Sequence, residues 1–143
     1  MADVGISITV EGTILSYAFG KASKSLTQGG AKSPAGIIKN IANGIIKNVA
    51  LFGEKDVKDQ LYPGHGVDTG MLRRSISGRL IKDFQGQVDP GSVYYAYQVE
   101  HGWPSGKKGY QMFANSSKNI KQFQSSDQYD QLVDREIKRW LVR

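Results

Sequence analysis

The sequence predicts an α+β fold: a small, mainly antiparallel sheet packed by two to three helices, with a C-terminal helix. Three observations lead to this prediction. Apolar and polar residues alternate near the N-terminus, apolar stripes with helical spacing occupy residues 37–52 and 129–141, and strand-like segments bounded by turn residues lie between them. An order of strand, helix, helix, several strands and helix is typical of an α+β domain, in which helices pack against a small sheet.

The N-terminal quarter is expected to form a strand and a helix. Residues 4–10 place Val and Ile at every second position, as in a strand with one buried face. Helical spacing of apolar residues then extends from Ile14 to Leu26, and Gly29-Gly30 ends this helix.

A second helix is expected to begin at Ser33-Pro34, where an N-cap residue precedes a proline at the first helical position. Its apolar stripe consists of Ile37, Ile38, Ile41, Ile45, Val49 and Phe52. Gly53 either ends this helix or interrupts it before a continuation over Glu54 to Leu61. Residues 62–66 are predicted to be a loop because of their proline and glycines.

The second half is expected to contain strands, a short helix and a final long helix. Ile76 to Leu80 begins a strand region, and residues 84–88 form its return partner. Residues 89–92 (Asp-Pro-Gly-Ser) are a strong turn signal, and Tyr95 to Gly102 is a short helix.

The C-terminal third is expected to begin with a loop over residues 102–109. It should be exposed and mobile and should not pack within its own subunit, because it holds three glycines, a proline and two lysines. Tyr110 to Ala114 is predicted to be a further strand, and residues 115–126 are polar and weakly patterned. The C-terminal amphipathic helix carries Tyr129, Leu132, Val133, Ile137, Trp140 and Leu141.

Composition narrows the class of protein. A chain of 143 residues suits one domain, residues 1–143, with a real core. No apolar run approaches the roughly 20 residues of a membrane span, so no membrane contact is expected. The N-terminus lacks the pattern of a signal peptide. The absence of cysteine excludes disulfides and thiolate metal sites, and it fits a reducing cytoplasm.

The net charge of +6 results from 19 basic and 13 acidic residues. Such a balance favours contact with nucleic acid or with an acidic protein surface. The basic residues are spread along the chain and no run exceeds two, so most are expected to be solvated. An electrostatic match to an acidic partner subunit is the next interpretation, and direct DNA binding the third.

Two blocks are the most informative segments: residues 67–76 (VDTGMLRRSI) and residues 94–102 (YYAYQVEHG). In the first block, Asp68 or Thr69 is suited to cap a short helix, and Gly70 suits a tight turn. Apolar pairs at i,i+4 in each block are expected to be buried, while Arg73 and Arg74 project outward. The residues that define the blocks are Asp68, Thr69, Gly70, Leu72, Arg73, Ser75, Tyr95, Ala96, Val99, Glu100 and Gly102.

The order DTG-x-LR-x-S, hairpin, YA-x-x-VE-x-G resembles the lambdoid-phage family of minor tail components, which includes tail-completion, or head–tail joining, neck proteins. The family often has a Pro-Phe pair after VE-x-G and a downstream Pro-Ala, whereas residues 111–115 here keep only the aromatic. The resemblance implies a virion structural protein of the head–tail junction that is assembled in the host cytoplasm. It also implies a homo-oligomeric ring, most often a hexamer. This tail terminator would cap the tail tube and contact the head-completion or connector proteins, and DNA would pass through it without specific binding.

No constellation for catalysis is found, so an enzyme is not expected, and neither is a metal or another cofactor. His65, His101 and Asp68 lack any metal-binding spacing. Asp68 and Glu100 suggest a nuclease or glycosidase pair, but a cap by Asp68 and an ion pair of Glu100 with Arg73 or Arg74 is the better interpretation. A small hydrolase is therefore the weakest class.

Aromatic residues and lysines gather around the loop at residues 102–109. Aromatics interleaved with lysines suit contact with a single nucleic-acid strand, so a small basic nucleic-acid-binding module is the alternative function. Core packing combined with an intersubunit contact is the preferred interpretation, because Tyr and Trp are favoured in interfaces. The interface candidates are Trp103, Lys107, Lys108 and Tyr110.

Overall fold

The computed structural model describes residues 5–10, 12, 34–63, 66–67, 70–93 and 95–141. The predicted helix from Ile14 to Leu26 and the start of the second helix at Ser33 lie outside these residues. The elements in chain order are β1 (Ile6–Ile8), α2 (Pro34–Asp59), β2 (Tyr62–Pro63), β3 (Gly66–Val67), α3 (Met71–Ser75), β4 (Ser77–Lys82), β5 (Gln85–Asp89), α4 (Ala96–His101), α5 (Met112–Gln124) and α6 (Asp127–Leu141). The predicted α+β class is confirmed.

The main sheet of the described residues is antiparallel, with the strand order β1-β5-β4. Both predicted strand regions are therefore present, although the first is shorter than expected. Ile6 and Ile8 are buried and Ser7 between them is exposed, as the alternation of the sequence predicts. A separate pair of two-residue strands, β2 and β3, lies within the segment expected to be a loop.

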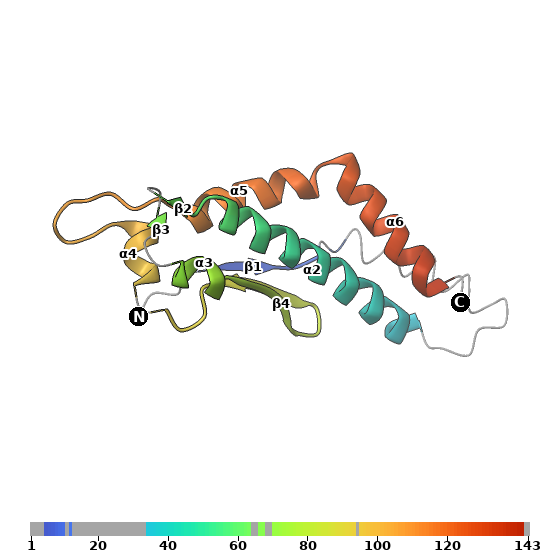
Figure 1. The fold of residues 1–143 in the computed structure, drawn as a ribbon. Helices are drawn as coiled ribbons and strands as arrows, with labels where there is room; N and C mark the ends of the chain where they lie inside the picture. The colour runs from blue at the N-terminus through green and yellow to red at the C-terminus, as the bar shows by residue number, and fades with distance from the viewer. Residues whose placement is uncertain are drawn as a thin grey trace.

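Helix α2 crosses one face of the sheet. Helices α5 and α6 pack along another side of α2 (Figure 1). It is continuous through Gly53, so the expected break there is wrong. A Cβ at this position would lie 2.8 Å from Val88 Cγ2 and 2.9 Å from Ile120 Cδ1. Gly53 therefore lets side chains of β5 and α5 converge on the same point of the helix, which outweighs the roughly 1 kcal/mol that glycine costs within a helix.

The β4–β5 hairpin lies directly against α2. A Cβ on Gly78 would collide with the carbonyl oxygen of Ala50, so only glycine allows the strand this close to the helix backbone. The Gly78 N–H donates to Glu54 Oε1 at 2.9 Å, which links the edge strand to the helix. Contact between strand and helix is therefore made by backbone as well as by side chains.

The turn of this hairpin is held to α2 by polar side chains. Phe84 adopts a left-handed conformation with φ of 66°. Its N–H donates to Asn43 Oδ1 at 2.9 Å, and Asn43 Nδ2 donates to Asp83 Oδ1 at 3.0 Å. Lys39 Nζ lies 3.9 Å from Asp83 Oδ2. These contacts stabilise a turn conformation that a non-glycine residue rarely adopts.

The C-terminal third forms two helices. The strand predicted for residues 110–114 is wrong, because α5 already begins at Met112 and extends through most of the polar segment. The amphipathic C-terminal helix is confirmed as α6, with Tyr129, Leu132, Val133 and Ile137 buried. Phe123 stacks on Phe52 with ring centroids 4.5 Å apart, so α5 packs against α2 through aromatic side chains.

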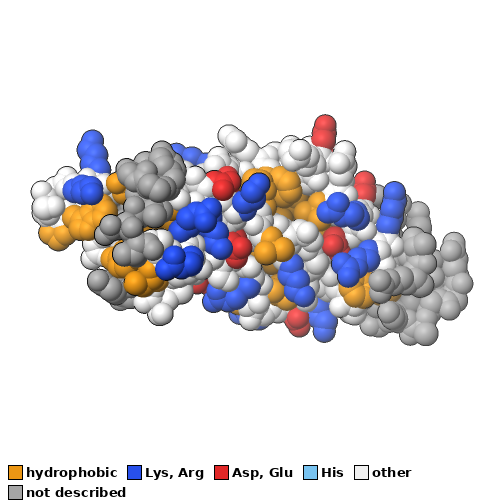
Figure 2. All heavy atoms as spheres, viewed as in Figure 1, with side chains coloured by type: hydrophobic (Ala, Val, Ile, Leu, Met, Phe, Trp, Pro, Cys, Tyr) orange, Lys and Arg blue, Asp and Glu red, His pale blue; other side chains and the backbone are white. Residues whose placement is uncertain are grey.

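Charged residues are distributed over the surface. Figure 2 shows Lys and Arg side chains scattered over one face of the molecule, with Asp and Glu side chains between them. None of the helices in the described part of the chain is both long and apolar enough to cross a membrane.

Candidate functional site

The first block forms a turn followed by the short helix α3. Gly70 occupies the N-cap position with φ of 78°, in the left-handed region that suits glycine. The sequence predicted the cap at Asp68 or Thr69, but the N-cap is Gly70, so the helix begins two residues later than a cap at Asp68 implies and one residue later than a cap at Thr69 implies. Asp68 and Thr69 themselves lie outside the described residues, as does His65.

The apolar and basic residues of this block are placed as predicted. Leu72 and Ile76 are both buried in the common core, and Arg73 and Arg74 are exposed. The Arg73 side chain donates through Nε to the carbonyl oxygen of Lys58 at 3.1 Å, near the end of α2. Ser75 donates through Oγ to the carbonyl oxygen of Leu72 at 2.7 Å. Arg73 and Ser75 therefore both bind backbone carbonyl groups.

The second block forms α4, as predicted. Ala96 and Val99 are buried, and Tyr95 packs partly buried against the same core cluster. Gly102 ends the helix with φ of 111°, and its N–H donates to the carbonyl oxygen of Gln98. His101 is exposed, and its ring lies 4.5 Å from that of Tyr97. Both blocks therefore contribute side chains to a single core.

Glu100 does not form the expected ion pair with Arg73 or Arg74. It is only 4% exposed, and its carboxylate accepts hydrogen bonds from the N–H groups of Phe113 (2.7 Å) and Ala114 (3.0 Å). These are the second and third residues of α5, whose own N-cap residue, Gln111, makes no side-chain cap. Glu100 therefore caps α5 from another helix, and a carboxylate is favoured there by the helix dipole.

Backbone contacts reinforce this junction between α4 and α5. The N–H of Tyr110 donates to the carbonyl oxygen of Val99 at 2.7 Å, and that of Gln111 to the carbonyl oxygen of Glu100 at 3.0 Å. Tyr110, an interface candidate, is half-buried against the core. The segment that follows the loop is therefore fixed to α4 before it enters α5.

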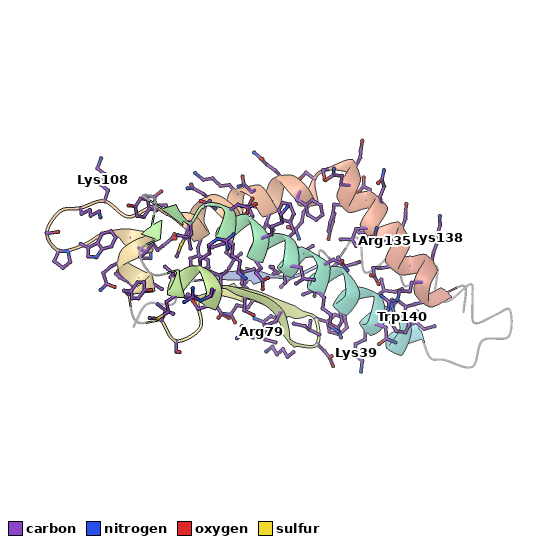
Figure 3. All side chains as sticks on the ribbon, viewed as in Figure 1. Lys39, Arg79, Lys108, Arg135, Lys138 and Trp140 are labelled. Carbon is purple, nitrogen blue, oxygen red and sulfur yellow. The ribbon has the colours of Figure 1, made fainter. Side chains whose placement is uncertain are left out.

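The loop at residues 102–109 has a defined hairpin-like structure. Gly102 and Lys108 form an antiparallel bridge, the Trp103 N–H donates to the carbonyl oxygen of Lys107 at 2.9 Å, and the Gly106 N–H donates to that of Trp103. The loop extends beyond α4, and Lys108 points away from the molecule (Figure 3). Residues 104–108 are exposed, as predicted.

Trp103 corrects one expectation about this loop. It was expected not to pack within its own subunit, yet it is half-buried and packs against the core. Lys107 Nζ lies 4.9 Å from the centre of its ring, a cation–π contact. The exposed interface candidates of this loop are therefore Lys107 and Lys108, and Trp103 serves mainly to attach the loop to the domain.

A polar cluster between α2 and α5 was missed by the sequence patterns. Ser116 is fully buried, donates to Asp56 Oδ2 at 2.6 Å and accepts from Gln60 Nε2. Gln60 Nε2 also donates to the carbonyl oxygen of Met112, and Asn119 Nδ2 donates to Asp56 Oδ2 at 2.9 Å. The polar face of α5 is partly buried by this cluster, which explains why residues 115–126 show no apolar stripe.

Two further observations concern metal binding by the described residues and the similarity of the whole chain to known proteins. Within the described ranges, no group of three or more His, Cys, Asp or Glu residues is arranged to hold a metal ion. No protein-family model, curated protein or solved structure matches this chain.

Proposed function

We propose that this chain is a structural protein of a phage virion, acting at the head–tail junction. In this proposal it forms a ring, a hexamer if it follows the family it resembles, that caps the tail tube and joins it to the head-completion or connector proteins. The proposal rests on the two sequence blocks and their spacing. It places the protein in the virion after assembly in the host cytoplasm.

One observation supports a structural role for these blocks over a catalytic one. Glu100, the most prominent acidic residue of the second block, is buried and both its carboxylate oxygens accept hydrogen bonds from the N-terminus of α5. Arg73 and Ser75 of the first block bind backbone carbonyl groups. Used in this way, the buried Glu100 carboxylate holds the fold together and is not available to a substrate.

A ring requires two different surfaces of each subunit to meet with a rotation that closes. A domain of this size leaves part of its apolar surface to neighbours, and the described residues expose Leu51, Met71, Ile81, Phe84 and Tyr97. The loop with Lys107 and Lys108 extends from one end of the molecule and suits contact with an adjacent ring. DNA would pass through the opening without specific contacts.

Deletion of the gene from the phage genome tests this proposal. We expect full heads and unattached or overlong tails, viewed by electron microscopy of the lysate, and restored particles when the wild-type protein is supplied from a plasmid. Normal infectious particles without the protein would refute the assignment.

The second candidate is a small nucleic-acid-binding module, favoured by the net charge of +6. Trp103 weakens it, because Lys107 lies over its ring and the core covers part of it, which leaves less of the ring for stacking on a base. DNA binding that falls steeply with salt would support this candidate. A ring that forms without any affinity for DNA would support the virion role.

A further inference from the structure

An exposed stripe on α2 combines two lysines with an apolar residue. Lys47, Leu51 and Lys55 follow each other at intervals of four residues, all are exposed, and Leu51 is 55% exposed. Among the described carboxylates, none lies within ion-pair distance of Lys47 or Lys55. The stripe, called here the basic stripe, covers about 12 Å along the helix axis.

A second stripe, of opposite charge, lies on α6. Asp127, Asp130 and Asp134 are exposed and spaced three and four residues apart, so they line one side of the helix over about 10 Å. In the described part of the chain, no cation lies within ion-pair distance of them. The helix dipole favours the first two, near the N-terminus of α6, but it does not account for Asp134.

The two stripes cannot meet within one molecule. Glu136, two residues after Asp134, faces α2: Asn48 Nδ2 donates to its Oε1 at 3.4 Å, and Gly44 leaves room for its carboxylate. Residues two apart on a helix point about 200° apart, so Asp134 and its stripe face away from α2. The basic stripe therefore stays uncovered by the acidic one of the same chain.

We propose that the basic stripe of one copy binds the acidic stripe of the next copy, head to tail. This inference rests on the proposed ring and names its subunit interface. The stripes have opposite charge and similar length and lie on two different helices, so they offer the two different surfaces that a heterologous contact needs. DNA fits the basic stripe less well, because Leu51 at its centre offers nothing to a phosphate.

Charge reversal tests the proposal in the purified full chain. Lys47→Glu with Lys55→Glu makes one stripe acidic, and Asp130→Lys with Asp134→Lys makes the other basic. Sedimentation velocity should show self-association weakened roughly ten- to a hundredfold in each double variant. An equimolar mixture of the two should assemble again, because alternating copies restore attraction at every interface.

Lys118→Glu with Lys121→Glu is the matched control for the basic-stripe variant, since it changes the net charge by the same amount on exposed positions of α5. It should associate like the wild type, and thermal unfolding should show that all variants fold. A ring that forms equally in the wild type and both stripe variants would overturn this interface and leave the virion role standing. A monomeric wild type whose salt-sensitive DNA binding is lost on reversal of the basic stripe would also overturn it, in favour of nucleic acid. Separate heads and tails in the deletion phage test the proposed function independently of either result.

Discussion

Replacement of Glu100 by alanine is expected to destabilise the whole domain by removing the cap of α5. The side chain is buried, and its two oxygens accept the N–H groups of Phe113 and Ala114 at 2.7 and 3.0 Å. The side chain of Gln111, the N-cap residue, offers these N–H groups no second acceptor. The variant therefore leaves two helix N–H groups without an acceptor, and that of Phe113 is buried.

The expected loss is about 2–4 kcal/mol. Loss of an N-cap costs roughly 0.5–2 kcal/mol, and a hydrogen bond to a charged group contributes about 1.5–3 kcal/mol. These ranges overlap because they describe the same groups, so they are not added in full. At roughly 2–4 °C per kcal/mol, the melting temperature should fall by about 5–15 °C. Glu100→Gln keeps one good acceptor and should lose about half as much.

Thermal and urea unfolding measure this effect, and hydrogen exchange of the Phe113 amide localises it. Asp59→Ala is the matched control, because it removes the same charge from an exposed position. If Glu100→Ala unfolds at the same temperature as Asp59→Ala, the carboxylate does not hold α5, and our account of the second block fails.

Three further substitutions test other contacts by the same unfolding measurements. Leu72→Ala should lose roughly 2–5 kcal/mol, because it truncates a fully packed side chain, and an unchanged melting temperature would contradict that packing. Gly78→Ala should lose about 1–3 kcal/mol or more, since the new Cβ meets the Ala50 carbonyl oxygen; a stabilised variant would contradict the close approach. Trp103→Ala should lower monomer stability by about 1–2 kcal/mol, and no loss would mean that the loop is not attached through its ring.

The roles of these residues affect how loss of function in their variants is interpreted. Substitutions in the two blocks, such as Glu100→Ala or Leu72→Ala, act on folding and will reduce assembly indirectly. Substitutions in exposed stripes, such as Lys55→Glu, leave the core intact and act on association. A stability measurement must therefore accompany every assembly measurement, because only a variant with unchanged stability reports on a surface.

Elements whose burial is periodic along the chain could be predicted from the amino-acid pattern. The alternation around Ile6 and Ile8, the stripe of α2 and the amphipathic pattern of α6 each predict their element, because one face of each is buried by apolar side chains. The turn residues around Gly91 and the end of α4 at Gly102 follow from backbone conformations that glycine adopts easily.

Elements whose stabilising groups come from distant parts of the chain could be recognised only once the chain was folded. Helix α5 lacks a cap and an apolar stripe of its own, since Glu100 supplies the cap from eleven residues before Gln111, and Asp56 and Gln60 bind its buried Ser116. Gly53 looks like a helix breaker in the sequence, and only the packing of Val88 of β5 and Ile120 of α5 against it shows why glycine is needed there. A local sequence pattern predicts one helix or strand at a time. The burial and hydrogen bonds of that element depend on which other segment of the chain packs against it.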